Sequence, residues 1–180
     1  MTFETEFTQI VFEGRVFKVR QDRVSYPDGR RVQMDIVDHH DAVTILPVDG
    51  DGQVWFIRQY RHAAGKELLE LPAGVAEIGE AMDVSAQREL REEIGMGAKH
   101  MEKIGGFYLA PGYSTEYMHV FLATDLYPAP LPGDESEFLS VEKIEARQAL
   151  QLAETGGLDD SKSLITLFWA RPLLARLGVI

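Results

Sequence analysis

Residues 74–96 read GVAEIGEAMDVSAQRELREEIGM, a stretch that indicates one helix with glycines on either side. Apolar residues recur along it at the spacing of a single helical face, at Met82, Ala86, Leu90 and Ile94. Gly95 stands directly after the last of them, where a glycine commonly ends a helix. The pattern therefore predicts an amphipathic helix over residues 81–94 that packs against a core along one edge.

Three glutamates lie beside this apolar edge. Glu89 and Glu93 are four residues apart, and Glu92 follows Glu89 by three, so their carboxylates share an arc of about 100° on the helix. Like charges at this spacing destabilise a helix. The cluster therefore calls for a compensating charge or a bound cation.

Two interpretations of the cluster stay open on the residues alone. Arg88 and Arg91 could relieve the repulsion on a solvent-exposed face. Alternatively, hard divalent cations take carboxylate, carbonyl and water oxygens, and the glycine loop before the helix could turn a carbonyl near Ala73 or Gly74 toward the carboxylates. Magnesium prefers phosphate oxygens as co-ligands, so a cation site would predict a phosphate ester or anhydride as the substrate.

The composition excludes several classes of protein. There is no cysteine among the 180 residues, which excludes disulfides, thiolate catalysis and cysteine zinc sites. The formal net charge of -11 gives no basic excess for nucleic acid, so we expect no nucleic-acid partner. The N-terminus lacks the features of a signal peptide, and no apolar run is long enough to span a bilayer. We expect a cytoplasmic protein with no membrane partner.

The chain begins with three predicted strands, at 8–13, 15–25 and 31–38. They form a small antiparallel sheet that buries little by itself. We therefore expect residues 1–40 to be an N-terminal sheet region that packs on the rest of the chain or on a second subunit, and residues 41–180 to be the main domain.

Strands and helices are mixed in the remainder of the chain. Further strands are predicted at 42–48, 53–60, 67–72, 103–109 and 117–123. A loop is expected over 127–137, a helix over 142–154, and a last helix from residue 160 or 161 that Pro172 kinks or breaks. This order favours a mixed sheet flanked by helices, of the α/β class.

Residues 74–96 also resemble a known motif, the Nudix box. Its pattern is a glycine, five residues, a glutamate, seven residues, Arg-Glu, an aliphatic, any residue, Glu-Glu, any residue, a glycine and an aliphatic. Every fixed position is filled here, from Gly74 and Glu80 to Met96. The resemblance implies the Nudix α/β/α sandwich with a mixed sheet, preceded here by the small N-terminal antiparallel sheet. It also implies hydrolysis of a nucleoside diphosphate linked to another moiety.

Segments outside the box resemble the ADP-ribose pyrophosphatase branch of that superfamily. They are RQYR at 58–61, ELPAG at 70–74, APGYSTE at 110–116, DESE at 134–137 and DDSKSL at 159–164. This resemblance implies a nucleotide-sugar substrate, with ADP-ribose giving AMP and ribose 5-phosphate. GDP-mannose and FAD pyrophosphatases share these segments and remain alternatives, as does a non-catalytic nucleotide-sensing Nudix module.

The resemblance also implies roles for individual residues. Two or three Mg²⁺ ions, with Mn²⁺ as an alternative, would be held by Ala73 (through its carbonyl), Glu89, Glu92, Glu93 and Glu137. Catalytic roles fall to Glu135 as general base and to Glu92 and Glu93, and Glu116 is the rival base. Substrate binding is implied for Arg61, Glu70, Pro111, Gly112 and Glu116.

Two further expectations concern structure. We interpret Arg88 as structural, because it can reach Glu80 or Glu92 and hold the loop on the helix. The branch resemblance also implies that the N-terminal sheet is exchanged across a two-fold axis, so we expect a homodimer.

Overall fold

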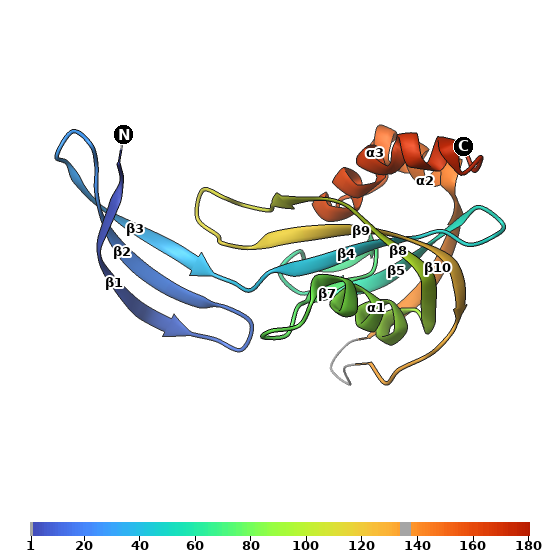
Figure 1. The fold of residues 1–180 in the computed structure, drawn as a ribbon, viewed down its shortest axis with the longest axis horizontal. Helices are drawn as coiled ribbons and strands as arrows, with labels where there is room; N and C mark the ends of the chain where they lie inside the picture. Colours follow the sequence, from blue (N-terminus) through green and yellow to red (C-terminus); the bar gives the residue numbers. More distant parts are fainter. Residues whose placement is uncertain (1, 134–137) are drawn as a thin grey trace. The chain divides into compact units, whose positions relative to one another are not determined.

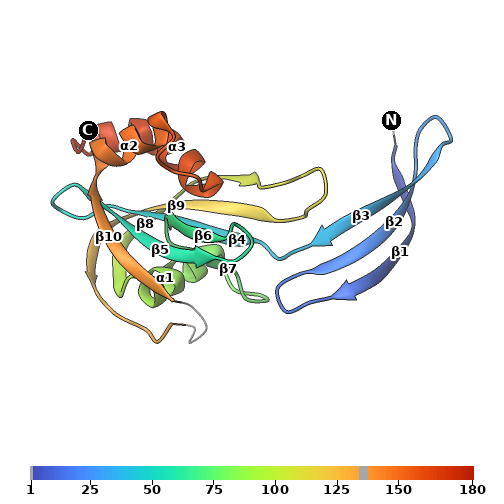
Figure 2. The ribbon, with the colours of Figure 1, turned by 180° about the vertical axis from the view of Figure 1, so that it is seen from behind.

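The computed structural model of the chain describes residues 2–133 and 138–180 and contains two compact units (Figures 1 and 2). The first unit comprises Met1–Asp41 and Phe107–Tyr117, and the second comprises Ala42–Gly106 and Met118–Ile180. Within the described residues, no helix is both long enough and apolar enough to cross a membrane.

The first unit contains the small antiparallel sheet that the sequence predicts. Its strands are β1 (Glu4–Glu13), β2 (Lys18–Ser25) and β3 (Arg31–Asp38), in the order β1-β2-β3. The end of β3 is joined to the 107–117 segment, since Val37 N–H donates to Tyr113 O (2.7 Å) and Thr115 N–H to Val37 O (3.0 Å). Large apolar side chains of β1 stay about half exposed on both faces, at Phe7, Ile10, Val11 and Phe12.

The second unit holds all the described helices and the other strands, except the last two residues of β8 and the first residue of β9. The strands are β4 (Ala42–Pro47), β5 (Gln53–Arg61), β6 (Lys66–Glu70), β7 (Ala73–Val75), β8 (Met96–Tyr108), β9 (Tyr117–Pro128) and β10 (Leu139–Glu145), and the helices are α1 (Met82–Glu93), α2 (Ala146–Thr155) and α3 (Ser161–Arg176). One sheet has the order β10-β5-β6, and a second, mixed sheet has the order β7-β4-β9-β8 with β4 and β9 parallel. Figures 1 and 2 show α1 on one side of these strands and α2 with α3 on the other. The predicted α/β/α sandwich is confirmed.

The two faces of the strands build two apolar clusters. On the α1 side, Ala86, Leu90 and Ile94 pack with Val43 and Ile57, so the apolar edge predicted for this helix is confirmed. The start of α1 has no side-chain cap hydrogen bond. Burial of this edge, worth about 1.5–3 kcal/mol for one leucine, helps to hold the helix on the sheet. Gly95 follows at a positive φ of 71° and ends it as predicted.

The predicted helix over 142–154 is wrong at its beginning. Residues 142–145 belong to β10, which pairs antiparallel with β5 so that Glu142 lies opposite Phe56, and α2 starts only at Ala146. Helical preference is a weak signal over four residues, and pairing with a strand far away in the sequence overrides it.

Two other expectations also need correction. The glycine loop before α1, expected over residues 74–79, begins as a strand, because the backbone of β7 pairs with β4 as far as Val75. Pro172 does not break the last helix, since α3 runs continuously from Ser161 to Arg176. Proline removes one backbone N–H, and packing of Leu167, Ala170 and Leu174 in the core offsets that loss.

Candidate active site

Helix α1 carries its three clustered glutamates at the boundary between core and solvent. Glu89 and Glu93 are buried, with 8% and 6% of their surface exposed, and the Glu92 side chain is 25% exposed. Burying a carboxylate is costly unless it is paired or binds a cation. This burial disfavours the interpretation of the cluster as a fully solvated charged face.

Arg88 connects these carboxylates to the loop that precedes the helix. Its Nη1 donates to Glu89 Oε1 (2.6 Å) and to Glu92 Oε2 (3.0 Å), and its Nε and Nη2 donate to the two oxygens of Glu80 (3.1 and 3.0 Å). A further bond reaches the backbone oxygen of Val75 (3.2 Å). The hydrogen bond with Glu80 is the main cause that raises the pKa of Arg88, and the same bond lowers the pKa of Glu80. The structural interpretation of Arg88 is confirmed.

The carboxylate of Glu89 lies directly against the backbone of β7. A Cβ atom built on Gly74 would stand 2.0–2.3 Å from the Glu89 carboxylate carbon and oxygens. Non-bonded atoms do not approach so closely, so only glycine leaves room for this carboxylate. The glycine that opens the 74–96 motif is therefore required by packing against this carboxylate.

We expect Gly74→Ala to displace the Glu89 carboxylate and to weaken divalent-cation binding by at least about 10-fold, the usual cost of disturbing the groups around a metal. The measurement is a titration of the purified protein with Mn²⁺, followed by electron paramagnetic resonance. Gly50→Ala is the matched control, because a Cβ at Gly50 meets nothing within 4 Å. Equal Mn²⁺ affinity in the two variants would contradict this expectation.

Glu93 contacts the residue whose carbonyl the sequence predicts as a metal ligand. Ala73 N–H donates to Glu93 Oε2 at 2.9 Å. The preceding carbonyl, of Pro72, accepts from Ile45 N–H at 2.9 Å. The start of β7 is thus fixed between α1 and β4, with Glu93 beside it.

Arg61 and Glu70, both predicted to bind substrate, bind each other in the structure. Nε and Nη2 of Arg61 donate to the two Glu70 oxygens at 2.7 Å each, and Lys162 Nζ donates to the same carboxylate. Burial of the Glu70 carboxyl would by itself raise its pKa, but the hydrogen bond from Arg61 and the charge of Lys162 hold that pKa below its ordinary value. The hydrogen bond with Glu70 in turn raises the pKa of Arg61.

The chemistry of the carboxylate cluster fits a hard divalent cation. Two buried carboxylates and a partly exposed one share an edge of α1, and Gly74 places no side chain between Glu89 and the backbone. Arg88 and the Ala73 N–H occupy several of these oxygens, and within residues 2–133 and 138–180 no group of three or more acidic or histidine side chains is arranged to hold a metal ion. Binding a cation would therefore require Arg88 to give up some of its contacts.

The remaining predicted site residues are placed elsewhere or lie outside the described structure. Pro111, Gly112 and Glu116 belong to the first unit, where Glu116 N–H donates to Ser114 Oγ (3.2 Å). Glu135 and Glu137 lie outside the described residues. The structure thus brings together six of the predicted residues in the second unit: Arg61, Glu70, Ala73, Glu89, Glu92 and Glu93.

The chain before residue 134 is held at the C-terminal end of α1. Ala129 N–H donates to Gly95 O (3.0 Å), Leu131 N–H to Arg91 O (3.1 Å), and Arg91 Nε to Ala129 O (2.8 Å). A Cβ on Gly133 would lie 3.4 Å from the backbone oxygen of Glu92. The last described residues before position 134 therefore lie against the last turn of α1, beside the backbone of Glu92.

Sequence reasoning assigned no role to Lys162 or Ser163, which contact this region from α3. Lys162 is only 7% exposed, and Ser163 Oγ accepts from Leu71 N–H at 2.7 Å. The sequence feature that could have pointed to these two residues is the segment 159–164, which resembles the ADP-ribose pyrophosphatase branch. Nothing in that segment indicated that Lys162 is buried beside Glu70, which lies 92 residues earlier in the chain.

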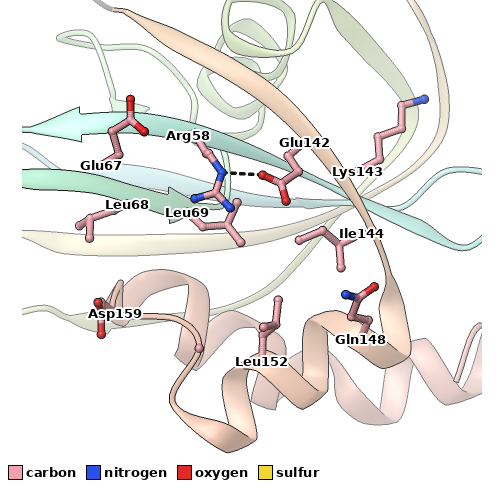
Figure 3. A pocket seen from close by; sticks show the side chains of 11 residues that line it. Arg58, Glu67, Leu68, Leu69, Glu142, Lys143, Ile144, Gln148, Leu152 and Asp159 are labelled. Atoms are coloured by element: carbon pink, nitrogen blue, oxygen red, sulfur yellow. Dashed lines mark hydrogen bonds and ion pairs between the residues drawn. The ribbon is translucent and has the colours of Figure 1, made fainter.

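A separate pocket of about 380 Å³ lies between the β10-β5-β6 sheet and α2, and Figure 3 shows its lining. Arg58 and Glu142 form an ion pair at its wall (2.6 Å), and Leu69 and Leu152 contribute apolar surface. None of the predicted site residues lines it. Its charged side chains are of both signs and do not select a ligand.

The chain matches known proteins along most of its length. Residues 38–167 match the NUDIX domain. The chain is 36% identical to the ADP-ribose pyrophosphatase of Bacillus subtilis over 85% of its own length and 84% of the relative's. It is 32% identical to the ADP compounds hydrolase NudE of Escherichia coli over 94% and 92%. A crystal structure of an ADP compounds hydrolase superposes with a TM-score of 0.89 at 27% identity, covering 100% of this chain and 98% of the other. The chain therefore belongs to the Nudix hydrolase superfamily, and its predicted placement in the ADP-ribose pyrophosphatase branch is confirmed.

Proposed function

We propose that this Nudix hydrolase cleaves the pyrophosphate bond of a nucleoside diphosphate sugar in a Mg²⁺-dependent reaction, converting ADP-ribose to AMP and ribose 5-phosphate. The observation that carries the proposal is the buried Glu89 carboxylate, which fills the space that Gly74 leaves beside it. The similarity to the Bacillus subtilis ADP-ribose pyrophosphatase supports the choice of substrate.

Each group of residues has a distinct task in this proposal. Two or three cations would be held by Glu89, Glu92, Glu93, Glu137 and the Ala73 carbonyl. When bound, these cations neutralise charge on the diphosphate and acidify a water molecule. Arg88 would give up part of its contact with Glu89 and Glu92 to the cations and would stay fixed to the loop by its two bonds to Glu80. Mn²⁺ could replace Mg²⁺, because both accept carboxylate and carbonyl oxygens.

Proton transfer and substrate binding fall to residues outside the cluster. We propose that Glu135 accepts the proton of the attacking water. Arg61 would contact a phosphate, with Glu70 fixing its orientation. A guanidinium has five N–H donors, so the two bonds to Glu70 are compatible with a further contact. Pro111, Gly112 and Glu116 are proposed to bind the remainder of the substrate.

A second candidate is hydrolysis of other ADP compounds by the same chemistry. It is favoured by the 32% identity to NudE and by the structural match to an ADP compounds hydrolase. The test is a panel of ADP-ribose, other ADP compounds, GDP-mannose and FAD with Mg²⁺, scored by phosphate release after phosphatase coupling. We expect the highest kcat/KM for ADP-ribose. A higher value for GDP-mannose or FAD would overturn the substrate, and no hydrolysis of any compound would favour a sensing module.

We also propose that residues 1–40 form a dimerisation region and residues 41–180 the catalytic domain. The half-exposed apolar side chains on both faces of β1 support this, because a strand with two apolar faces needs a partner surface. We expect a homodimer that Ile10→Lys weakens by at least about 10-fold, and deletion of residues 1–40 should give aggregate or inactive monomer. Val141→Lys, on the similarly exposed β10, is the matched control. Light scattering during turnover is the measurement, and a fully active monomer would contradict the proposal.

A further inference from the structure

The connection from β6 to β7, taken with the strand residue at each of its ends, is fixed more heavily than an ordinary loop. Residues 70–73 pass from the β10-β5-β6 sheet to the mixed sheet and end at Ala73. Each of the four makes a hydrogen bond to a residue distant in sequence. These bonds join Glu70 to Arg61 and Lys162, Leu71 to Ser163, Pro72 to Ile45, and Ala73 to Glu93.

Two of these contacts come from the first turn of α3. Asp160 caps the helix by accepting from Ser163 N–H (3.0 Å), and Ser163 Oγ accepts from Leu71 N–H (2.7 Å). Lys162 Nζ lies between the Glu70 carboxylate and Asp160 Oδ2, 3.0 Å from the latter. Lys162 and Ser163 are almost wholly buried, so water does not compete for these bonds.

The location of Ala73 beside the glutamate cluster depends, through this segment, on the location of α3. Leu71 is two residues before Ala73, and Pro72 between them has a φ locked by its ring. A displacement of Leu71 is therefore poorly absorbed by Pro72 and reaches Ala73, which bonds Glu93. Ala73 and Glu93 are both proposed metal ligands.

We propose that Lys162 and Ser163 are positioning residues of the metal site: they fix Glu70 and Leu71 and thereby set the place of Ala73 against Glu93. This inference rests on the proposed function, since it assigns a task toward the cation that the glutamate cluster would hold. Lys162 and Ser163 bond the segment at Glu70 and Leu71, and Ala73 at its other end bonds Glu93. They act through the connecting segment.

Ser163→Ala is the sharpest test, because it removes the two bonds of the Ser163 hydroxyl, from Leu71 N–H and to Asp160 Oδ2, while the backbone N–H of residue 163 still donates to Asp160 and keeps the cap. We expect it to weaken Mn²⁺ binding to the full-length protein by on the order of 10-fold, measured by electron paramagnetic resonance. The concentration of Mg²⁺ giving half-maximal kcat should rise by a similar factor. Lys162→Met should act in the same direction and Lys162→Arg should restore part of the affinity, because it keeps a positive charge beside Glu70.

Two control variants separate positioning from loss of stability. Arg171→Met changes an exposed residue of α3 and breaks its ion pair with Glu154 of α2, and it should bind Mn²⁺ as the wild type does. Leu174→Ala removes a fully buried side chain near the far end of α3, and it should lower the melting temperature without changing Mn²⁺ affinity. All titrations are made well below the melting temperature of every variant.

The outcomes distinguish this inference from the function on which it rests. Unchanged Mn²⁺ affinity in Ser163→Ala overturns the positioning role while the metal site stands. A loss of affinity in Leu174→Ala that matches its loss of stability also overturns it. A wild-type protein that binds no Mn²⁺ removes the metal site and this inference together.

Discussion

Replacing Glu93 by glutamine is expected to lower kcat by at least about 10²-fold. Glu93 is 6% exposed and accepts from Ala73 N–H, and a glutamine side chain has nearly the same shape and can still accept that bond. The substitution therefore removes a negative charge from the proposed cation site while leaving the packing of α1 almost unchanged.

Steady-state hydrolysis of ADP-ribose over a range of Mg²⁺ concentrations measures this effect. Glu154→Gln is the control, since Glu154 lies on the surface of α2 and pairs with Arg171. The melting temperature of both variants should stay close to that of the wild type. Near-normal kcat of Glu93→Gln at every Mg²⁺ concentration would remove Glu93 from the metal site.

The second large effect concerns the general base. We expect Glu135→Gln to lower kcat by on the order of 10²–10⁴, the usual contribution of such a group, with little change in KM. The cluster glutamates are poor candidates for this task, because bound cations depress the pKa of their ligands. Glu135 lies outside the described residues, so this expectation rests on the sequence.

Glu116→Gln is the variant against which Glu135→Gln is compared. Glu116 is proposed to bind substrate, so its replacement should raise KM more than it lowers kcat. Steady-state kinetics on ADP-ribose would distinguish the two roles. If Glu135→Gln keeps its kcat and Glu116→Gln loses it, the assignment is reversed. If neither variant changes kcat, the water is activated by the metal ions alone.

Helix α1 could be predicted almost to its ends because the necessary information is local. The apolar spacing over 82–94 fixes its buried edge, and Gly95 ends it. The same spacing places Glu89 and Glu93 next to that edge, which is why both are buried. Arg88 could be interpreted correctly for the same reason, because its partners Glu80 and Glu92 lie within eight residues of it.

The contacts that escaped prediction join residues far apart in the chain. Residues 142–145 form a strand because β5 lies beside them, and their own sequence gave no sign of this pairing. Lys162 is buried because Glu70 faces it, and neither residue type indicates burial by itself. The need for a glycine at position 74 could be read from the motif, but the Glu89 carboxylate that fills the space beside it could not.

The most direct measurement is the conversion of ADP-ribose by the purified full-length protein, with products separated by chromatography in the presence of Mg²⁺ and again in excess EDTA. We expect AMP and ribose 5-phosphate in equal amounts with Mg²⁺, no product in EDTA, and recovery of activity when Mg²⁺ or Mn²⁺ is restored. Undiminished hydrolysis in EDTA would contradict the metal site, and intact ADP-ribose under both conditions would contradict the proposed activity.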